Sequence, residues 1–260
     1  SVASAVALYR FLKTKGMAAT VVADGYTVPK SYRFLPDHDV VKSHLPTPRQ
    51  LVITVGIDKT HISDFHYDVV DDQFKLYLTP KHTAFGPQDI KASLSDWHYD
   101  AIVVLDSPDF ESLGATYTAQ REFFYERPVI NIDHSPANEQ FGQINLIDLT
   151  ASSTAAVVYR LLSTWDDAAI DADTATCLLA GIIDATRSFK SGAINPQTLA
   201  ISGKLMEKQA RRDEIVKHLY YSRDVATLKL WGTVLTKLQE SFGGRVVLAT
   251  VAQEDFTATV

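Results

Sequence analysis

The stretch Pro128-Val-Ile-Asn-Ile-Asp-His-Ser-Pro-Ala-Asn-Glu139 decides how the rest of the chain is organised. Its apolar run predicts a short buried strand, and Asp133 and His134 follow directly where that strand ends. In an open α/β sheet, ligands bind at the carboxyl ends of the strands. An acid beside an imidazole at such an end can hold a divalent metal or move a proton, whereas an Asx-type turn with an ordinary histidine is the alternative.

Composition narrows the class of protein. The chain has 260 residues, 46% of them hydrophobic, which is enough for a large core in one domain or two unequal ones. The net charge of −6 gives no general attraction to nucleic acid or anionic membrane, so a nucleotide partner needs a local patch. The single cysteine, Cys177, excludes a disulfide framework, and no apolar run reaches the roughly 18 residues of a membrane span. We therefore expect a cytoplasmic protein with no membrane segment and no signal peptide.

The order of expected elements predicts an α/β fold, with parallel strands joined by crossover helices to about residue 165 and a helical segment after it. An antiparallel hairpin around Asp71-Asp72-Gln73 is expected on the edge of the sheet. The expected strands are 18–23, 51–56, 101–105, 129–132, 144–148 and 245–251, and the expected helices are 2–15, 110–124, 155–163, 171–183, 196–208, 211–220 and 224–239.

This order suggests three parts: residues 1–165 as an α/β domain, 166–242 as its helical part and connector, and 243–260 as the beginning of a further domain. The helical pattern starts at Ser1 without a strand before it. We therefore expect a first strand on the N-terminal side of Ser1.

A second acid strengthens the interpretation of the strand end. Asp106 closes the apolar strand 101–105, and neighbouring strands of a sheet lie about 4.8 Å apart. Asp106, Asp133 and His134 could therefore converge on one cation. Nearby, Asn138 and the hydroxyls of Ser152, Ser153 and Thr154 lie where an anion could bind at a helix N-terminus, with simple helix capping as the alternative.

Several of these segments together resemble the DHH phosphoesterases, most closely the branch of the nanoRNases and phosphoadenosine-phosphate phosphatases, which is related to RecJ-type exonucleases. The resemblance covers nearly the whole chain. The segments that carry it are Val103-Val-Leu-Asp106, Asn131-Ile-Asp-His134, Asn138-Glu-Gln-Phe-Gly142, Ile144–Asp148, Ala151-Ser-Ser-Thr-Ala155 and Gly181–Phe189.

The resemblance implies a two-domain α/β protein with a dinuclear manganese site. It also implies a leading motif of metal ligands on the N-terminal side of Ser1, and a smaller C-terminal α/β domain that binds substrate, of which residues 243–260 are the beginning. Such a site cleaves phosphodiester or phosphomonoester bonds of short oligonucleotides, cyclic dinucleotides or related nucleotides. In the family pattern Asp106 would bridge both metals and His134 would ligate one of them. Asp133 would not bind a metal itself but would orient the residues that do.

The sequence also departs from the family pattern. Ser135 stands where the family has a second histidine that faces the substrate phosphate, so we consider Ser135 together with Asp133 as catalytic candidates. Ala185 stands at a metal-ligand aspartate, and Asp184 comes one residue early, about 100° away on a helix. Arg187 replaces a glycine and could pair with the site acids or contact a phosphate.

Two hypotheses follow. In the first, the protein is a manganese-dependent phosphoesterase with an altered site that holds one or two ions through Asp106, His134 and Asp184. In the second, it is a catalytically degenerate relative that binds a nucleotide or a protein partner and needs no metal. A homodimer is compatible with both.

Overall fold

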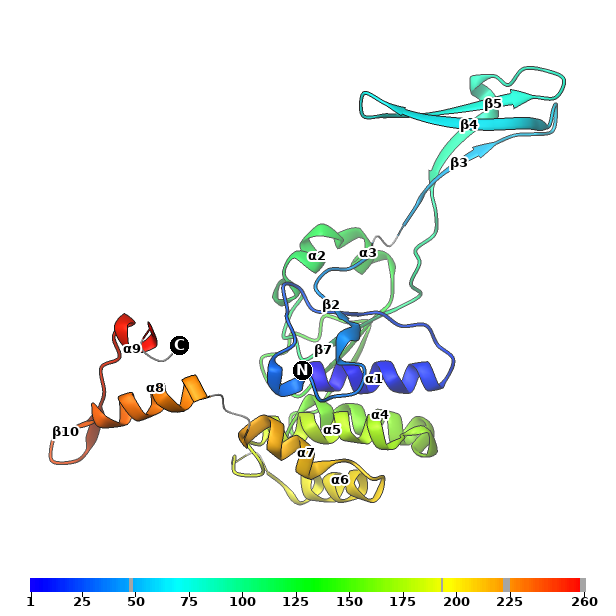
Figure 1. Cartoon of the computed structure of the whole chain (residues 1–260). Coiled ribbons are helices and arrows are strands. Elements are labelled where there is room, and N and C mark those ends of the chain that lie inside the picture. Colours follow the sequence, from blue (N-terminus) through cyan, green and yellow to red (C-terminus); the bar gives the residue numbers. More distant parts are fainter. Residues whose placement is uncertain (47–48, 193, 222–224, 258–260) are drawn as a thin grey trace. The chain divides into compact units, whose positions relative to one another are not determined.

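The computed structural model describes residues 1–46, 49–192, 194–221 and 225–257, and it confirms the α/β class (Figure 1). Asp224, the expected first residue of the last helix, lies outside the described residues. The chain forms two compact units, the first made of residues 1–44, 103–119 and 129–260 and the second of residues 45–102 and 120–128. We describe each unit by itself; the expected boundaries at 165 and 242 stay predictions.

The first unit contains a sheet of strands β7 (Ile102–Leu105), β8 (Val129–Asp133) and β9 (Ile144–Ile147), in that order. Strands β8 and β9 are parallel. The bonds from Ile102 N to Pro128 O and from Asp106 N to Ile132 O advance in the same direction, so β7 also runs parallel to β8. The carboxyl ends of all three strands consequently lie at one edge of the sheet.

Helices cover one face of this sheet. Ile132 is fully buried in a core that it shares with the helices α1 (Val2–Thr14), α4 (Thr154–Asp166) and α5 (Ala172–Ala185). Since side chains alternate along a strand, Asn131 and Asp133 belong to the opposite face. The apolar period of β8 thus directs its polar residues away from the helical core.

A glycine sets how closely these helices approach. A Cβ on Gly181 of α5 would lie 2.7 Å from the Ala155 Cβ of α4 and 3.5 Å from the Ala3 Cβ of α1. Small residues at all three positions therefore allow the helix backbones to touch. This contact fixes the first turn of α4, which carries Thr154 at the end of the sheet.

Beyond α5, the helices α6 (Pro196–Glu207), α7 (Arg212–Val216) with a π turn (Lys217–Tyr221) and α8 (Val225–Thr236) and the strand β11 (Val246–Leu248) agree with the expected segments as wholes. The strand β10 (Gln239–Ser241) and the helix α9 (Gln253–Thr257) were not expected. Short 3₁₀ turns across the whole chain are Lys30–Tyr32, His38–Val40, Pro87–Asp89, Glu111–Leu113 and Asp167–Ala169.

Two further expected features are different in the structure. The helix expected over 110–124 is divided into Glu111–Leu113, α2 (Ala115–Ala119) and α3 (Arg121–Glu126), because Gly114 takes a left-handed φ of 61° and turns the chain. The strand expected over 18–23 is reduced to β1 (Val21–Val22), which pairs with β2 (Val41–Lys42) outside the main sheet.

The second unit contains antiparallel ladders and the helix α3. The hairpin β4 (Ile62–Val70) and β5 (Gln73–Pro80) is confirmed, but its expected place on the parallel sheet is wrong, because it forms a ladder of its own. The strand expected over 51–56 is β3 (Leu51–Val55), which pairs with β6 (Ile90–Leu94) instead of joining the parallel sheet. Strand β6 lies in a segment for which no strand was expected.

The hairpin exposes one apolar face. The pairs Phe65 with Leu78, Tyr67 with Leu76 and Val69 with Phe74 place six apolar side chains on the same side. Phe65, Tyr67 and Val69 are each more than 60% exposed.

Within the described ranges, none of the helices combines the length and apolar character needed to cross a bilayer.

Candidate metal centre

Asp106, Asp133 and His134 converge at the carboxyl edge of the sheet. One potential ligand atom from each lies within 4.8 Å of the others. Asp106 follows β7, and Asp133 with His134 ends β8, so the parallel pairing of these strands brings the three together. The structure therefore confirms the convergence that the two strand ends predict.

Asp133 is the buried member of this cluster, with 1% of its surface exposed. Its Oδ1 accepts hydrogen bonds from the backbone N–H groups of His134 at 2.7 Å and Ser135 at 3.2 Å. Its Oδ2 accepts from Asn138 Nδ2 at 2.9 Å. Most of its lone pairs are thus in use, so Asp133 is suited to hold the His134 turn in place and leaves Asp106 and His134 as the open donors.

Thr154, 1% exposed at the start of α4, connects these two donors. Its Oγ1 lies 2.6 Å from Asp106 Oδ1 and 3.0 Å from His134 Nδ1. A hydroxyl has one proton to donate, and an ionised carboxylate can only accept. Thr154 therefore donates to Asp106, and His134 donates its Nδ1 proton to Thr154. The same Nδ1 lies 3.7 Å from Asp106 Oδ1 and 3.5 Å from Asp133 Oδ1, so Nε2 is the ring nitrogen that can offer a lone pair to a metal.

Asp106 has an unusual backbone and a stabilised charge. Its φ of 60° is left-handed, a conformation that aspartate tolerates better than most residues. Burial disfavours the ionised form of Asp106, whereas the hydrogen bond from the Thr154 hydroxyl and the nearby His134 ring lower the pKa of its carboxyl group.

A network of amides supports the loop that follows His134. Asn131, fully buried on β8, donates through Nδ2 to Asn138 Oδ1 at 2.7 Å and to Asn145 Oδ1 at 3.0 Å. Asn138 Nδ2 in turn reaches Ser107 O at 2.9 Å. A Cβ on Gly142 would lie 3.0 Å from Asn131 Cβ and 2.9 Å from two carbonyl oxygens, so this network needs glycine there. The amides fix the loop against the sheet.

The helix start contains one cap and one free hydroxyl. Ser153 Oγ accepts from Ala156 N at 3.2 Å, which is the N-cap bond of α4. Ser152 is 4% exposed, and its buried Oγ has no hydrogen-bond partner among the described residues. An unsatisfied buried hydroxyl is costly, so Ser152 is better placed than Ser153 to meet a ligand.

Other predicted residues lie apart from the cluster. Asp184 accepts a hydrogen bond from the Tyr32 hydroxyl at 2.6 Å and is not in the group of metal-ligating atoms found among the described residues. Arg187 is exposed on a left-handed turn after α5, with a φ of 49°. Ser135 follows His134 directly, and its Oγ accepts from Ala137 N at 3.2 Å.

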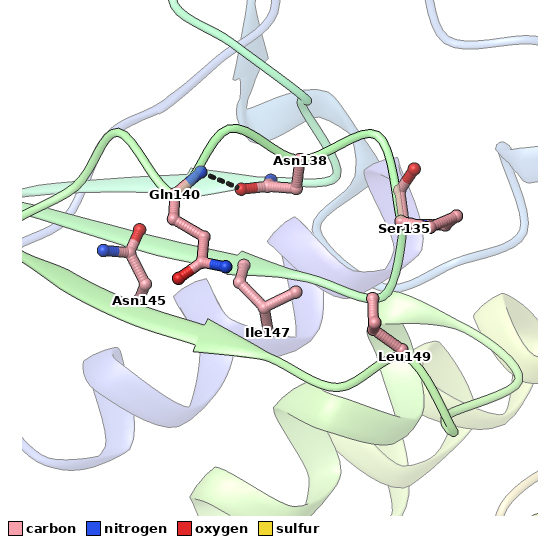
Figure 2. A pocket seen from close by; sticks show the side chains of 7 residues that line it. Ser135, Asn138, Gln140, Asn145, Ile147 and Leu149 are labelled. Atoms are coloured by element: carbon pink, nitrogen blue, oxygen red, sulfur yellow. Dashed lines mark hydrogen bonds between the residues drawn. The ribbon is translucent and has the colours of Figure 1, made fainter.

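A shallow cavity of 220 Å³ lies beside the cluster, between the loop and β9 (Figure 2). Its lining is formed by Ser135, Pro136, Asn138 and Gln140 from the loop and by Asn145, Ile147 and Leu149 from β9 and its end. None of these side chains is charged.

Sequence reasoning did not select Asn131 or Asn145 as site residues, and it considered Thr154 only as part of an anion site at the helix start, not as a partner of the metal ligands. Thr154 stands in the Ser-Ser-Thr helix start, and a hydroxyl there was a usable signal. Asn131 interrupts the apolar run of β8, and a buried amide in a strand indicates a side-chain network. Their partners follow only from the folded structure.

The comparison with known families decides the identity of this fold. The model of the DHH family, N-terminal domain, matches residues 1–182. The chain belongs to the DHH family. The DHH resemblance predicted from the strand ends is thereby confirmed.

DHH relatives extend beyond the length of this chain. The bifunctional oligoribonuclease and PAP phosphatase NrnA of Thermus thermophilus is 30% identical over 130 residues, which cover 48% of this chain and 38% of that protein. The uncharacterized protein MG371 homolog of Mycoplasma pneumoniae is 33% identical over 205 residues, covering 78% and 57%. The chain thus covers less than two thirds of either relative.

A solved structure has the same fold. The exopolyphosphatase-related protein of Bacteroides fragilis superposes with a TM-score of 0.71 at 18% identity, over 99% of this chain and 63% of that protein. At this identity the likeness concerns the fold alone.

The donor set fits a divalent cation. Carboxylate oxygens and a neutral imidazole are ligands suited to manganese and similar metals. The tautomer that Thr154 imposes leaves a lone pair on His134, and outer hydrogen bonds of this kind are usual for metal-binding histidines.

Proposed function

We propose that this DHH-family protein is a metal-dependent phosphoesterase that hydrolyses ester bonds in short oligonucleotides or related nucleotides. The cluster of Asp106, Asp133 and His134 carries the proposal, because its ligand atoms lie within 4.8 Å of one another at the edge where α/β sheets bind ligands. The oligoribonuclease and phosphatase named for the Thermus relative supports the substrate class.

In this proposal Asp106 and His134 hold one or two Mn²⁺ ions, and Asp133 orients His134 through the backbone of the turn. The bound metal supplies Lewis acidity and lowers the pKa of a coordinated water. Thr154 accepts a hydrogen bond from His134 Nδ1, which orients the imidazole, and its own hydroxyl donates to Asp106. Asn138 serves as a positioning residue, since its amide is occupied by Asp133 and the neighbouring strand and is not free for substrate.

The phosphate is proposed to lie at the start of α4. The positive end of a 13-residue helix favours an anion, and the unpartnered Ser152 hydroxyl offers a hydrogen bond there. Ser135 can donate one hydrogen bond beside it, in the position of the family's second histidine. Arg187 is proposed to reach the phosphate from the turn after α5.

The second candidate function is binding without catalysis. The Ser135 hydroxyl is not acidic near neutral pH, so it cannot protonate a leaving group as an imidazolium can. The Asp184 carboxylate accepts a hydrogen bond from Tyr32 and does not lie with Asp106 in the metal-ligating cluster. Both observations favour a relative that retains a nucleotide or protein partner after losing part of the reaction. A homodimer and a cytoplasmic location also stay predictions; the exposed apolar face of β4 and β5 supports the former.

Hydrolysis of the dinucleotide pApA by the full chain tests the proposal. We expect Mn²⁺-dependent release of AMP that is lost on Asp106→Asn and retained by Asp39→Asn, an exposed aspartate outside the cluster. Binding of pApA without cleavage at any Mn²⁺ concentration would instead establish the second candidate.

A further inference from the structure

We propose that the cavity between the loop and β9 is a nucleobase site for the nucleotide whose phosphate meets the metal centre. This inference rests on the proposed function, which supplies the phosphate position. The cavity has 220 Å³, below the size of sites that hold whole drug-sized ligands, so it suits one ring system rather than a complete nucleotide.

The free polar groups of the cavity are few and specific. The side-chain amides of Asn138 and Asn145 already have partners. Asn138 bonds to Asn131 and Asp133, and Asn145 bonds to Asn131 and to the Gly142 carbonyl. Among the described residues, the side-chain amide of Gln140 has no hydrogen-bond partner. The Ser135 hydroxyl accepts from Ala137 N and keeps its proton for donation.

These groups match a neutral heterocycle. A glutamine amide offers a donor and an acceptor in one plane, which is the pattern that pairs with N6 and N7 of adenine. Ile147 and Leu149 add an apolar surface against which a flat ring can pack. Since no charged side chain lines the cavity, a phosphate would find no counter-charge there.

The backbone aims Gln140 at this space. Its φ of 54° is left-handed, a costly conformation for glutamine, and the bond from Gln140 N to Asn138 Oδ1 at 2.9 Å holds it. In Figure 2 the side chain extends from the loop toward β9, between Asn145 and Ile147. Strain at this position is explained if the side chain has a ligand to meet.

The cavity and the metal centre share one support. Asn138 lines the cavity and donates to Asp133 Oδ2, and Ser135 lines the cavity and donates through its backbone to Asp133 Oδ1. A ring in the cavity is therefore held by the same loop that positions His134. A base and its phosphate can then be oriented together.

Calorimetry on the full chain with Mn²⁺ tests the inference by comparing AMP with ribose 5-phosphate, which lacks the base. We expect AMP to bind about tenfold more tightly, the order of discrimination that a bidentate amide–base pair gives. Gln140→Ala should reduce this preference to less than twofold. The control is Gln209→Ala, which replaces another exposed glutamine with a left-handed φ, 66°, and should keep it.

Equal affinity for AMP and ribose 5-phosphate in the unaltered protein, or no binding of either, would overturn the inference. A preference for AMP that survives Gln140→Ala would also overturn it. The pApA assay separates this from the proposed function: a Gln140-dependent preference without cleavage upholds the base site and refutes the phosphoesterase, whereas cleavage without the preference does the reverse.

Discussion

Replacing Thr154 by valine tests whether this residue orients the metal ligand. Valine keeps the volume and branching of threonine but removes the hydroxyl that donates to Asp106 at 2.6 Å and accepts from His134 at 3.0 Å. A hydrogen bond to a charged group contributes about 1.5–3 kcal/mol. Loss of an outer partner of a metal ligand typically weakens metal binding about 10–100-fold, which corresponds to about 1.4–2.7 kcal/mol, and the two ranges agree.

The assay combines Mn²⁺ titration by calorimetry with nitrogen NMR of the metal-free histidine. We expect Thr154→Val to bind Mn²⁺ at least tenfold more weakly and to lose the single Nδ1–H tautomer of His134, whose signal is assigned by its absence in His134→Gln. Thr154→Ser retains the hydroxyl and should restore both. Unchanged Mn²⁺ affinity in Thr154→Val, or a His134 that remains Nδ1–H without the hydroxyl, would refute the reasoning.

Three further predictions concern the framework of the first unit. Gly181→Ala places a Cβ 2.7 Å from that of Ala155 and should lower the free energy of unfolding in urea by about 1–3 kcal/mol. The control is Gly203→Ala, which has open space around it and should raise the free energy of unfolding by about 0.5–1 kcal/mol. Equal effects of the two substitutions would contradict the close helix contact. Burial raises the pKa of the Cys177 thiol to about 12, so a disulfide reagent at pH 8 should modify it only after unfolding, and rapid reaction of the native protein would exclude this burial. Burial works against ionisation of Asp171, but the N-cap bonds from Thr174 together with the ion pair to Arg10 outweigh it and lower the pKa of Asp171. The contribution of Asp171 is therefore present above about pH 4 and lost as the pH falls through its folded pKa, so Asp171→Ala should cost about 0.5–2 kcal/mol at pH 7 and progressively less in acid; a cost independent of pH would count against it.

The sequence predicted local structure best where a residue pattern is compatible with only one kind of element. The run before Asp133 is too apolar to be exposed, and it became the buried strand β8. The serines before Thr154 predicted a helix start, and Ser153 is its N-cap. Both strand-end acids were found because an aspartate after an apolar strand can only lie at the edge of the sheet.

The sequence predicted poorly where pairing or register depends on distant residues. The alternation in Leu51–Val55 fits any half-exposed ladder, and only its partner Ile90–Leu94 shows that it lies outside the parallel sheet. The function of Thr154 could not be read because its two partners are 20 and 48 residues away. The one-residue offset of Asp184 was visible in sequence, but its bond to Tyr32 was not.

The central claim is that Asp106 and His134 form a metal centre, and electron paramagnetic resonance titration of Mn²⁺ into the full chain tests it most directly. We predict at least one Mn²⁺ bound per chain, with binding abolished by Asp106→Ala and retained by Asp39→Ala. A chain that binds no Mn²⁺, or that binds it equally well after Asp106→Ala, would contradict the account.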